Sequence, residues 1–208
     1  MKIVAIIQTR TGSKRFPKKV LKNIQNKSII DWVLKRTKKA KNVKKIILAT
    51  TRYKRDDILE NIAKKNKVQI YRGDEKNVLK RYFDAAKFYK ADVIVRICAD
   101  NPFIDPNQID YLIKKFKYKN YDYAYNHQRR LNTNYADGFG AEILTFNALE
   151  RVYLGAKSKN QKEHVTKYIW DNLKKFRILS IKSPKRLAYP QFKFDINTPE
   201  DYRLIKNF

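Results

Sequence analysis

The sequence predicts an α/β fold with a mostly parallel central sheet flanked by helices. Short apolar runs alternate with amphipathic segments four times before residue 117, and this order is typical of a parallel sheet with crossover helices. Hydrophobic residues make up 43% of the 208 residues, which is enough for the core of one domain. We therefore expect a single domain over residues 1–208, without internal repeats or linkers.

The elements of the first half follow from hydrophobic spacing. Apolar runs predict strands, and apolar residues three and four positions apart predict helices. The expected strands are 3–8, 45–50, 68–71 and 92–97, and the expected helices are 29–39, 56–66, 77–89 and 107–116.

The second half is less regular and should extend or cap the first sheet. Thr198 and Pro199 have the N-cap and first-turn chemistry of a helix start. The expected strands are 122–126, 141–146, 177–181 and 192–195, and the expected helices are 147–156, 161–173 and 199–206.

The cysteine content and the N-terminus bear on the compartment. A single cysteine, Cys98, excludes an internal disulfide framework and favours a reducing, cytoplasmic location. The chain begins on a strand-like pattern with no signal-peptide core, and it has no run of 18 apolar residues. We therefore expect a cytoplasmic protein without a membrane partner.

The formal charge of +28 invites a nucleic-acid interpretation. The lysines are scattered along the whole chain, so a biased, solvated surface explains the charge as well as an evolved polyanion groove does. Either arrangement would attract anionic ligands at low salt.

Ligands of an open α/β sheet bind beyond the carboxyl ends of the strands, which singles out the loops 9–18, 50–55, 72–76 and 98–106. The first loop carries five cations in ten residues, Arg10, Lys14, Arg15, Lys18 and Lys19. It matches neither a Walker A motif nor a GxGxxG turn. Its Gly12–Ser13 pair can turn backbone N–H groups inward, and its cations can neutralise a polyphosphate. A solvated basic turn would have the same composition.

Two aspartates end predicted strands near this loop. Asp100 follows the fourth strand, and Asp195 follows a later apolar alternation. Two carboxylates beside a triphosphate are what Mg²⁺ requires, with phosphate oxygens and water completing its octahedron. Turn and cap roles would also explain both residues, and spacing alone does not show that they meet.

Six phrases carry a resemblance to a known family. The segment IIQTRTGSKRFPKKVL resembles the signature loop of cytidylyltransferases that make CMP-activated sugars, such as the CMP-sialic acid and CMP-Kdo synthetases. Together with it, five further phrases resemble, in order and over nearly the whole chain, the cytidylyltransferase-like proteins of spore coat polysaccharide biosynthesis: RGDEKNVLKRYFDAA, VRICADNPFIDP, DGFGAEILTFNALE, EHVTKYI and DINTPEDYRLI.

This resemblance implies a nucleotide-diphosphosugar-transferase-like fold and an enzyme that transfers CMP from CTP to a sugar or sugar-acid acceptor, releasing pyrophosphate, for surface glycan biosynthesis. By resemblance, Asp100 and Asp195 would bind Mg²⁺. Arg10 and Lys19 would hold the triphosphate, Gly12 and Ser13 would shape the loop, and Arg10, Arg15 and Lys19 would stabilise the departing pyrophosphate.

The resemblance also assigns the two substrate pockets. Residues of the base and ribose pocket would be Thr50, Thr51, Arg72, Gly73 and Asp74. The acceptor side would include Asp137, Glu142 and His164. His164 lies on an expected helix beside Glu163, where a buried or capping role is the common alternative. Arg81 and Arg96 match positions carried by the closer relatives, without an assigned role.

The chain departs from the family in two places. It has Cys98–Ala99–Asp100 where several synthetases have a Gly before the metal aspartate, and Ala99 keeps a small residue there. Residues 118–136 match no acceptor signature. If the acceptor were a 2-keto sugar acid, Arg129 or Arg130 in that stretch could bind its carboxylate.

Two other functions stay open at this stage. One is a nucleotidyltransferase of the same fold that uses another nucleoside triphosphate and a sugar phosphate. The other is a non-enzymatic RNA- or polyanion-binding protein, to which the charge and the 14 Tyr and 11 Phe residues are suited. The aromatics lie at core spacing, however, and no RRM, KH or OB signature occurs. We therefore expect CTP and a small sugar-like acceptor as partners, Mg²⁺ as cofactor and no specific nucleic acid, and the sequence allows a homodimer.

Overall fold

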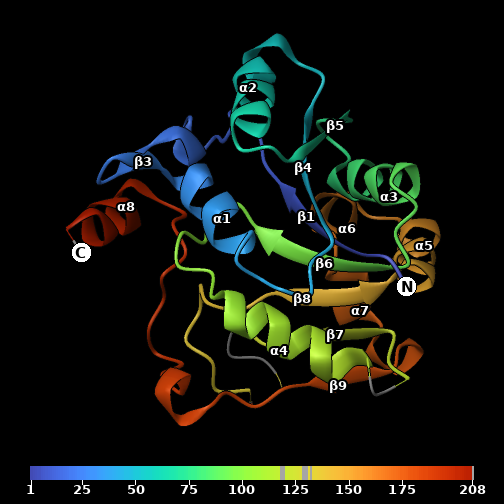
Figure 1. Cartoon of the computed structure of the whole chain (residues 1–208). Helices are drawn as coiled ribbons and strands as arrows, with labels where there is room; N and C mark the ends of the chain where they lie inside the picture. The colour runs from blue at the N-terminus through green and yellow to red at the C-terminus, as the bar shows by residue number, and fades with distance from the viewer. Residues whose placement is uncertain (118–119, 128–130, 132, 208) are drawn as a thin grey trace.

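The computed structural model describes residues 1–117, 120–127, 131 and 133–207. Seven strands form one sheet in the order β5-β4-β1-β6-β8-β7-β9 (Figure 1). Strand β8 is antiparallel to both of its neighbours, and all other pairs in this sheet are parallel. The strand bounds are Ile3–Gln8 (β1), Lys45–Thr51 (β4), Gln69–Gly73 (β5), Val93–Cys98 (β6), Tyr123–Tyr125 (β7), Glu142–Thr145 (β8) and Ile178–Ser180 (β9).

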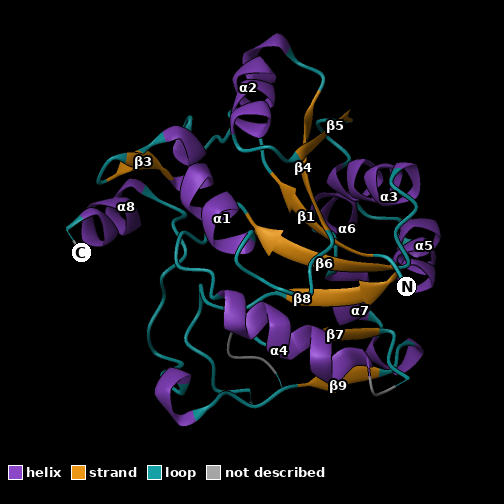
Figure 2. Cartoon of the chain, viewed as in Figure 1, coloured by secondary structure: helices purple, strands orange, loops and turns teal. Residues whose placement is uncertain are grey.

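Helices cover both faces of the sheet (Figure 2). Helices α1, α2 and α4 pack on one face, and α3, α5 and α7 pack on the other. The helix bounds are Ile29–Thr37 (α1), Asp57–Lys65 (α2), Val78–Phe88 (α3), Pro106–Lys117 (α4), Phe146–Gly155 (α5), Lys159–Glu163 (α6), Lys167–Asp171 (α7) and Pro199–Lys206 (α8). The predicted fold class, a mostly parallel sheet flanked by helices, is confirmed.

The central strands are apolar on both faces because both faces are covered. In β1, Ile3, Ala5 and Ile7 pack toward α1 and α4, whereas Val4 and Ile6 pack toward α3 and α5. This alternation follows from the two-residue period of a strand. The sheet core therefore holds the carboxyl ends of β1, β4, β5 and β6 in fixed register.

Polar caps determine where several helices begin. The Ser28 hydroxyl accepts a hydrogen bond from the Asp31 amide at the start of α1, and the Asn77 side chain accepts one from the Lys80 amide at the start of α3. Thr198 forms a capping box with Asp201 at the start of α8. Such side chains satisfy amides that the first helical turn leaves unpaired.

The C-terminal helix packs near the basic loop. Ile205 of α8 packs with Phe16, Ile24 and Ile29, and Ile196 belongs to the same apolar cluster. The Tyr202 hydroxyl donates to the carbonyl oxygen of Asn23 over 2.6 Å. Asn23 lies in a two-stranded hairpin formed by Asn23–Ile24 (β2) and Lys27–Ser28 (β3), beside α8 in Figure 1.

Two predictions for the second half are wrong. Residues 192–195 do not form a strand, because only Lys193 makes a bridge, to Asp137. Residues 161–173 do not form one helix: α6 ends before His164, which adopts φ −116° and ψ 102°, and α7 begins only at Lys167. The Thr166 hydroxyl in this break donates to the Glu142 carboxylate over 3.1 Å, so a tertiary contact holds the break in place. None of the helices in the described part of the chain has the length and apolar character needed to cross a bilayer.

Candidate functional site

Four loops meet at the carboxyl edge of the parallel strands. Gln8 at the end of β1 is level with Ala49 of β4 and Cys98 of β6, and Thr51 of β4 is level with Gly73 of β5. The loops that follow these strands therefore start at one edge of the sheet. This is the edge at which ligands of open α/β sheets bind.

The basic loop after β1 is closed on itself. The Thr11 carbonyl accepts a hydrogen bond from the Lys18 amide over 3.0 Å, and Lys18 has a left-handed backbone with φ 54°. The next residue, Lys19, donates from Nζ to Oδ2 of Asp100 over 2.8 Å. The loop thus brings one predicted phosphate-binding cation directly to one predicted metal-binding carboxylate.

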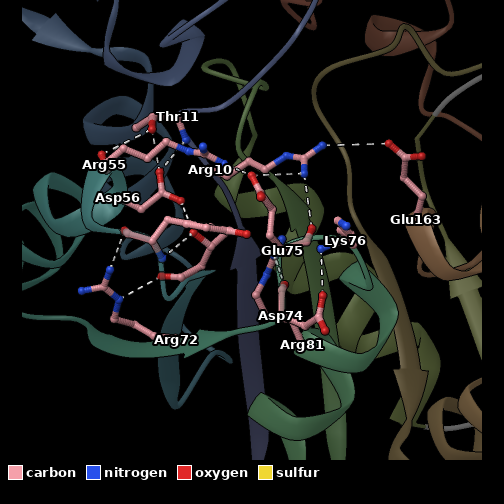
Figure 3. A network of polar contacts seen from close by, with 12 residues as sticks. Arg10, Thr11, Arg55, Asp56, Arg72, Asp74, Glu75, Lys76, Arg81 and Glu163 are labelled. Atoms are coloured by element: carbon pink, nitrogen blue, oxygen red, sulfur yellow. Dashed lines mark hydrogen bonds and ion pairs between the residues drawn. The ribbon is translucent and has the colours of Figure 1, made fainter.

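Arg10 extends across the site between carboxylates of two distant segments (Figure 3). Its Nη1 donates to the Glu75 carbonyl over 3.3 Å and lies 3.8 Å from the Glu75 carboxylate. Its Nη2 lies 4.0 Å from the Glu163 carboxylate. Arg55 also forms an ion pair with Glu75. Arg15, by contrast, is exposed.

A buried aspartate braces the loop from below. Asp56 is 0% exposed, and its Oδ1 accepts from the Thr11 amide over 2.8 Å and from the Thr11 hydroxyl over 2.6 Å. Its Oδ2 accepts from the Thr51 hydroxyl. Burial would raise the pKa of Asp56, but these hydrogen bonds outweigh it and lower the pKa below its ordinary value. Asp56 was not singled out from the sequence, because the segment 55–57 is typical of a helix start.

A cavity of about 340 Å³ opens beside this network. Gly73 and Asp74, two of the predicted nucleotide-pocket residues, line it. The Asp74 carboxylate accepts from the amides of Lys76 and Asn77, each over 2.8 Å, and so shapes the turn. A Cβ atom on Gly73 would lie 2.9 Å from Cγ of Arg81, so the close packing here favours glycine. The other lining residues are Arg52, Tyr53, Glu75 and Lys76.

Two arginines flank this cavity in different ways. The Arg72 guanidinium faces α2 and the loop before it, where it donates to the Thr51 and Tyr53 carbonyls over 2.9 Å each and pairs with Asp57 and Glu60. Arg81 is 2% exposed, and it donates to the Asp74 carbonyl over 2.6 Å. Burial, together with the nearby charge of Arg10, lowers the pKa of Arg81 to about 10.

Buried oxygens without hydrogen-bond partners gather at the same edge. Proteins rarely bury such atoms without a protein, water or ligand partner. Within the described residues they are Gln8 Oε1, Thr9 Oγ1, Thr50 Oγ1, Asn101 Oδ1 and Asp195 Oδ1. Their position supports a polar ligand at the ends of β1, β4 and β6.

The two predicted metal aspartates come together in the structure. The Asp100 carbonyl accepts a hydrogen bond from the Ile196 amide over 2.9 Å, which places the segment after Asp195 against the end of β6. Burial raises the pKa of Asp195, and the negative charges of Asp137 and Asp100 raise it further. Lys193 Nζ lies 3.6 Å from Asp195 Oδ1 and opposes this rise, although that oxygen accepts no hydrogen bond. A buried carboxylate oxygen of this kind is suited to a cation. No three His, Cys, Asp or Glu side chains in the described chain are grouped closely enough to hold a metal by themselves.

Glu142, a predicted acceptor residue, is the hub of a buried network. It is 2% exposed, forms an ion pair with Arg96 and accepts hydrogen bonds from the Tyr123 and Thr166 hydroxyls. Burial would raise the pKa of Glu142, but Arg96, His127 and Tyr123 hold it well below its ordinary value. Its carboxylate therefore stays ionised and bound to protein groups.

His127 joins this network to Asp137. Its Nε2 lies 3.6 Å from the Glu142 carboxylate and its Nδ1 lies 3.8 Å from the Asp137 carboxylate. Burial lowers the pKa of His127, but both carboxylates outweigh that effect and raise it above 6.5. His164, by contrast, is exposed, and its backbone amide donates to the Asn160 carbonyl at the end of α6. Arg129 and Arg130 lie outside the described residues.

The comparison with known proteins agrees with this geometry. The family model of cytidylyltransferases matches residues 4–208. The chain is 39% identical to an uncharacterized protein of Methanocaldococcus jannaschii, over 98% of this chain and 82% of that protein. It is 32% identical to the spore coat polysaccharide biosynthesis protein SpsF of Bacillus subtilis, over 98% of this chain and 85% of that protein.

Solved structures of similar fold also include cytidylyltransferases. A cytidylyltransferase from Leptospira borgpetersenii superposes with a TM-score of 0.91 at 33% identity, covering 99% of this chain and 85% of that one. A CMP:2-keto-3-deoxy-manno-octonic acid synthetase complexed with CTP shares the fold with a TM-score of 0.72 at 15% identity, covering 100% of this chain and 98% of that one. Sequence motifs, fold and relatives agree, and the chain belongs to the cytidylyltransferase family of nucleotidyltransferase enzymes.

Proposed function

We propose that this enzyme transfers CMP from CTP to a small sugar or sugar-acid acceptor and releases pyrophosphate, in the biosynthesis of a surface glycan. The observation that carries the proposal is the contact of Lys19 with Asp100, together with the hydrogen bond from Ile196 to the Asp100 carbonyl. These contacts unite the basic loop with both aspartates at one sheet edge. We assign these cations to a polyphosphate and these carboxylates to a metal, at one site.

The nucleotide side is suited to a triphosphate. Reactions of this kind ask the protein chiefly to position the phosphates and neutralise their charge. We assign the triphosphate to Arg10, which lies 3.8 Å from the Glu75 carboxylate, and to Lys19, which contacts Asp100, with Gly12 and Ser13 shaping the loop and exposed Arg15 beside it. We assign the base and ribose to the region of Thr50, Gly73 and Asp74. Arg72 would shape that pocket from behind, since its guanidinium is held by α2.

Mg²⁺ fits the carboxylate pair. The buried oxygen of Asp195 that accepts no hydrogen bond and the neighbouring Asp100 are hard oxygen donors, which Mg²⁺ prefers. Lys193, 3.6 Å from that oxygen, would move aside for the ion. When bound, the ion would neutralise charge on the transferring phosphates. Lys19 would then exchange its Asp100 contact for a phosphate oxygen.

The proposed reaction is an in-line displacement at the α-phosphorus of CTP. An acceptor hydroxyl oxygen forms the new bond to phosphorus, the bond from the α-phosphorus to the bridging oxygen breaks, and pyrophosphate leaves with that electron pair. The hydroxyl proton passes to solvent. Arg10, Arg15 and Lys19 would stabilise the charge on the departing pyrophosphate.

The acceptor is assigned to the side of the site built by the second half of the chain. Asp137 and exposed His164 are the proposed contacts, and Glu142 would act by fixing Arg96 and His127. The names of the relatives support a sugar-like acceptor. One is a 3-deoxy-manno-octulosonate cytidylyltransferase from Trichlorobacter lovleyi, 34% identical over 56% of this chain and 45% of that protein.

Thermal unfolding with CTP, UTP, GTP and ATP, each with and without Mg²⁺, tests the nucleotide assignment. A ligand that binds the native state raises the midpoint by mass action. We expect the largest rise with CTP and Mg²⁺, followed by pyrophosphate release when a panel of sugar acids and sugar phosphates is added. A larger rise in the unfolding midpoint with another triphosphate would identify that nucleotide, rather than CTP, as the donor. Equal shifts with all polyanions, abolished by salt, would reject the nucleotide pocket.

A further inference from the structure

Asp56 presents an unusual combination of burial and position. Its carboxylate is 0% exposed, and no ion pair of the described residues includes it. It directly precedes α2, yet its side chain caps no amide of that helix. Burying a carboxylate is costly unless its hydrogen bonds serve a specific arrangement. The usual role of an aspartate at a helix start therefore does not explain it.

Among the described residues, two threonines at the site edge make all the side-chain hydrogen bonds of Asp56. Oδ1 accepts both the amide and the hydroxyl of Thr11, and Oδ2 accepts the Thr51 hydroxyl. Thr11 follows Arg10 as the third residue of the basic loop, and Thr51 is the last residue of β4. Asp56 therefore fastens the loop after β1 to the end of the neighbouring strand.

Thr11 links Asp56 to the positions of Arg10 and Lys19, the two proposed phosphate-binding cations. Its amide belongs to the peptide group that joins it to Arg10, so the Asp56 contact fixes the direction in which Arg10 leaves β1. Its carbonyl accepts the Lys18 amide, which closes the loop and sets the position of Lys19. Figure 3 shows Asp56 beneath Thr11, with Arg10 extending from the same loop toward Glu75 and Glu163.

We propose that Asp56 is a positioning residue for nucleotidyl transfer, which holds the basic loop so that Arg10 and Lys19 address one triphosphate. This inference rests on the proposed function. Asp56 touches no substrate: it acts through Thr11. Because it sets where the two cations lie, a brace of this kind affects binding of the triphosphate without contacting the reacting atoms.

The decisive variants are Asp56→Asn, Asp56→Ala and Thr11→Val. Asparagine can still accept from Thr11 through its oxygen and can donate to the Thr51 hydroxyl, so it retains most of the brace. Alanine removes all three contacts, and Thr11→Val removes one hydroxyl while keeping the amide. We expect the KM for CTP to rise about tenfold or more in Asp56→Ala, less in Asp56→Asn and Thr11→Val, with kcat changing less than KM.

Asp110 supplies a matched structural control. Its carboxylate also accepts three hydrogen bonds, from the amides of Lys41 and Asn42 and from the Asn42 side chain. It braces a loop before β4, at the opposite edge of the sheet. Asp110→Ala should lower the melting temperature and leave the KM for CTP unchanged.

A binding measurement separates this inference from the proposed function. The affinity of each variant for inorganic triphosphate is measured by calorimetry, which needs no acceptor and no turnover. Weaker triphosphate binding in the Asp56 variants and in Thr11→Val, with normal binding in Asp110→Ala, supports the inference even if the wild type fails to use CTP, in which case the proposed function alone is rejected. Asp56 variants that melt earlier but keep wild-type triphosphate affinity and KM would overturn the inference. If Asp56→Ala does not fold, Asp56→Asn and Thr11→Val decide the question by the same criterion.

Discussion

At the level of single residues, Asp195 carries a charge that the folded state disfavours. Burial raises the pKa of its carboxyl, and the negative charges of Asp137 and Asp100 add to the effect. A carboxyl whose pKa is raised on folding destabilises the fold at every pH where it is ionised in the unfolded chain. Carboxyl groups that destabilise the fold in this way are common at functional sites, where a cation or metal can bind them.

We therefore predict that Asp195→Asn stabilises the ligand-free protein while abolishing turnover. The neutral amide removes the disfavoured charge, and the melting temperature at pH 7 without metal should rise by about 2–4 °C. Asp201→Asn is the control, because the amides of Asn197 and Thr198 outweigh burial and lower the pKa of Asp201. That variant should melt earlier. A lower melting temperature in Asp195→Asn would show that its charge stabilises the fold.

Cys98 lies two residues before Asp100 and is half-buried. Burial raises the pKa of its thiol to about 12, against the opposing effect of Arg96. Since the thiolate is the reactive form, native Cys98 should react with iodoacetamide at pH 8 about 1,000-fold more slowly than the same residue in urea-unfolded protein. Mass spectrometry of the time course measures this ratio. Comparable rates in both states would contradict the burial of the thiol.

At the level of elements, β8 is tied to its surroundings by one carboxylate. Glu142 joins this strand to Arg96 of β6, Tyr123 of β7 and Thr166 between α6 and α7. The antiparallel strand that interrupts the parallel sheet is thus linked to both neighbouring strands by side chains as well as by its backbone. Removing the carboxylate would leave Arg96, whose side chain is only 14% exposed, without its counter-charge.

We predict that Glu142→Gln lowers the free energy of unfolding by about 3–5 kcal/mol at pH 7, the usual cost of breaking a buried ion pair. Arg96, His127 and Tyr123 overcome the effect of burial and depress the pKa of Glu142. Its stabilising contribution is therefore present above the ordinary pKa of about 4.5 and is lost as the pH falls below it. Urea titrations at pH 7 and pH 3 should show the difference between variant and wild type shrinking in acid.

A double replacement gives the control for this prediction. Arg96→Met combined with Glu142→Leu removes both charges and should recover much of the lost stability. If the double variant were as unstable as Glu142→Gln, the loss would come from packing of β8 rather than from an uncompensated charge.

Local sequence patterns predicted some of the helices and strands correctly and failed for others. The strands 3–8 and 45–50 and the helix 199–206 were predictable because their apolar spacing and caps act locally. The segment 161–173 has a helical pattern, but Thr166 instead contacts Glu142 on another strand. The segment 192–195 alternates like a strand, but it finds only a single bridge to Asp137. Both failures come from tertiary partners that the local pattern does not contain.

At the level of the whole molecule, the candidate site was also only partly predictable from the sequence. The basic loop and Asp100 were predictable from their position after β1 and β6, because parallel strands end at one edge. The contact between the Asp100 and Asp195 segments joins residues far apart in the sequence through the hydrogen bond from the Ile196 amide to the Asp100 carbonyl, which no local pattern contains. Asp56 and His127 act through buried hydrogen bonds and ion pairs, and neither has a sequence pattern that distinguishes it from an ordinary helix start or loop residue.

The charge of +28 is a property of the whole surface. Lys and Arg number 48 against 20 Asp and Glu, so the molecule should attract any polyanion at low ionic strength. Binding by scattered surface cations depends on counterion release and weakens steeply with salt. A triphosphate held by a few aligned groups depends less on salt, because it involves fewer charges.

We predict that polyuridylate binds at about 20 mM NaCl and dissociates by about 300 mM, whereas the KM for CTP changes by less than tenfold over the same range. Fluorescence anisotropy of labelled RNA and pyrophosphate release measure the two effects in the same buffers. Asp100→Ala should abolish turnover without weakening RNA binding, because the two activities use different surfaces. RNA binding that persists in high salt and competes with CTP would place a nucleic-acid site at the carboxyl edge of the sheet. The surface charge would then belong to the function, rather than surround a site that works independently of it.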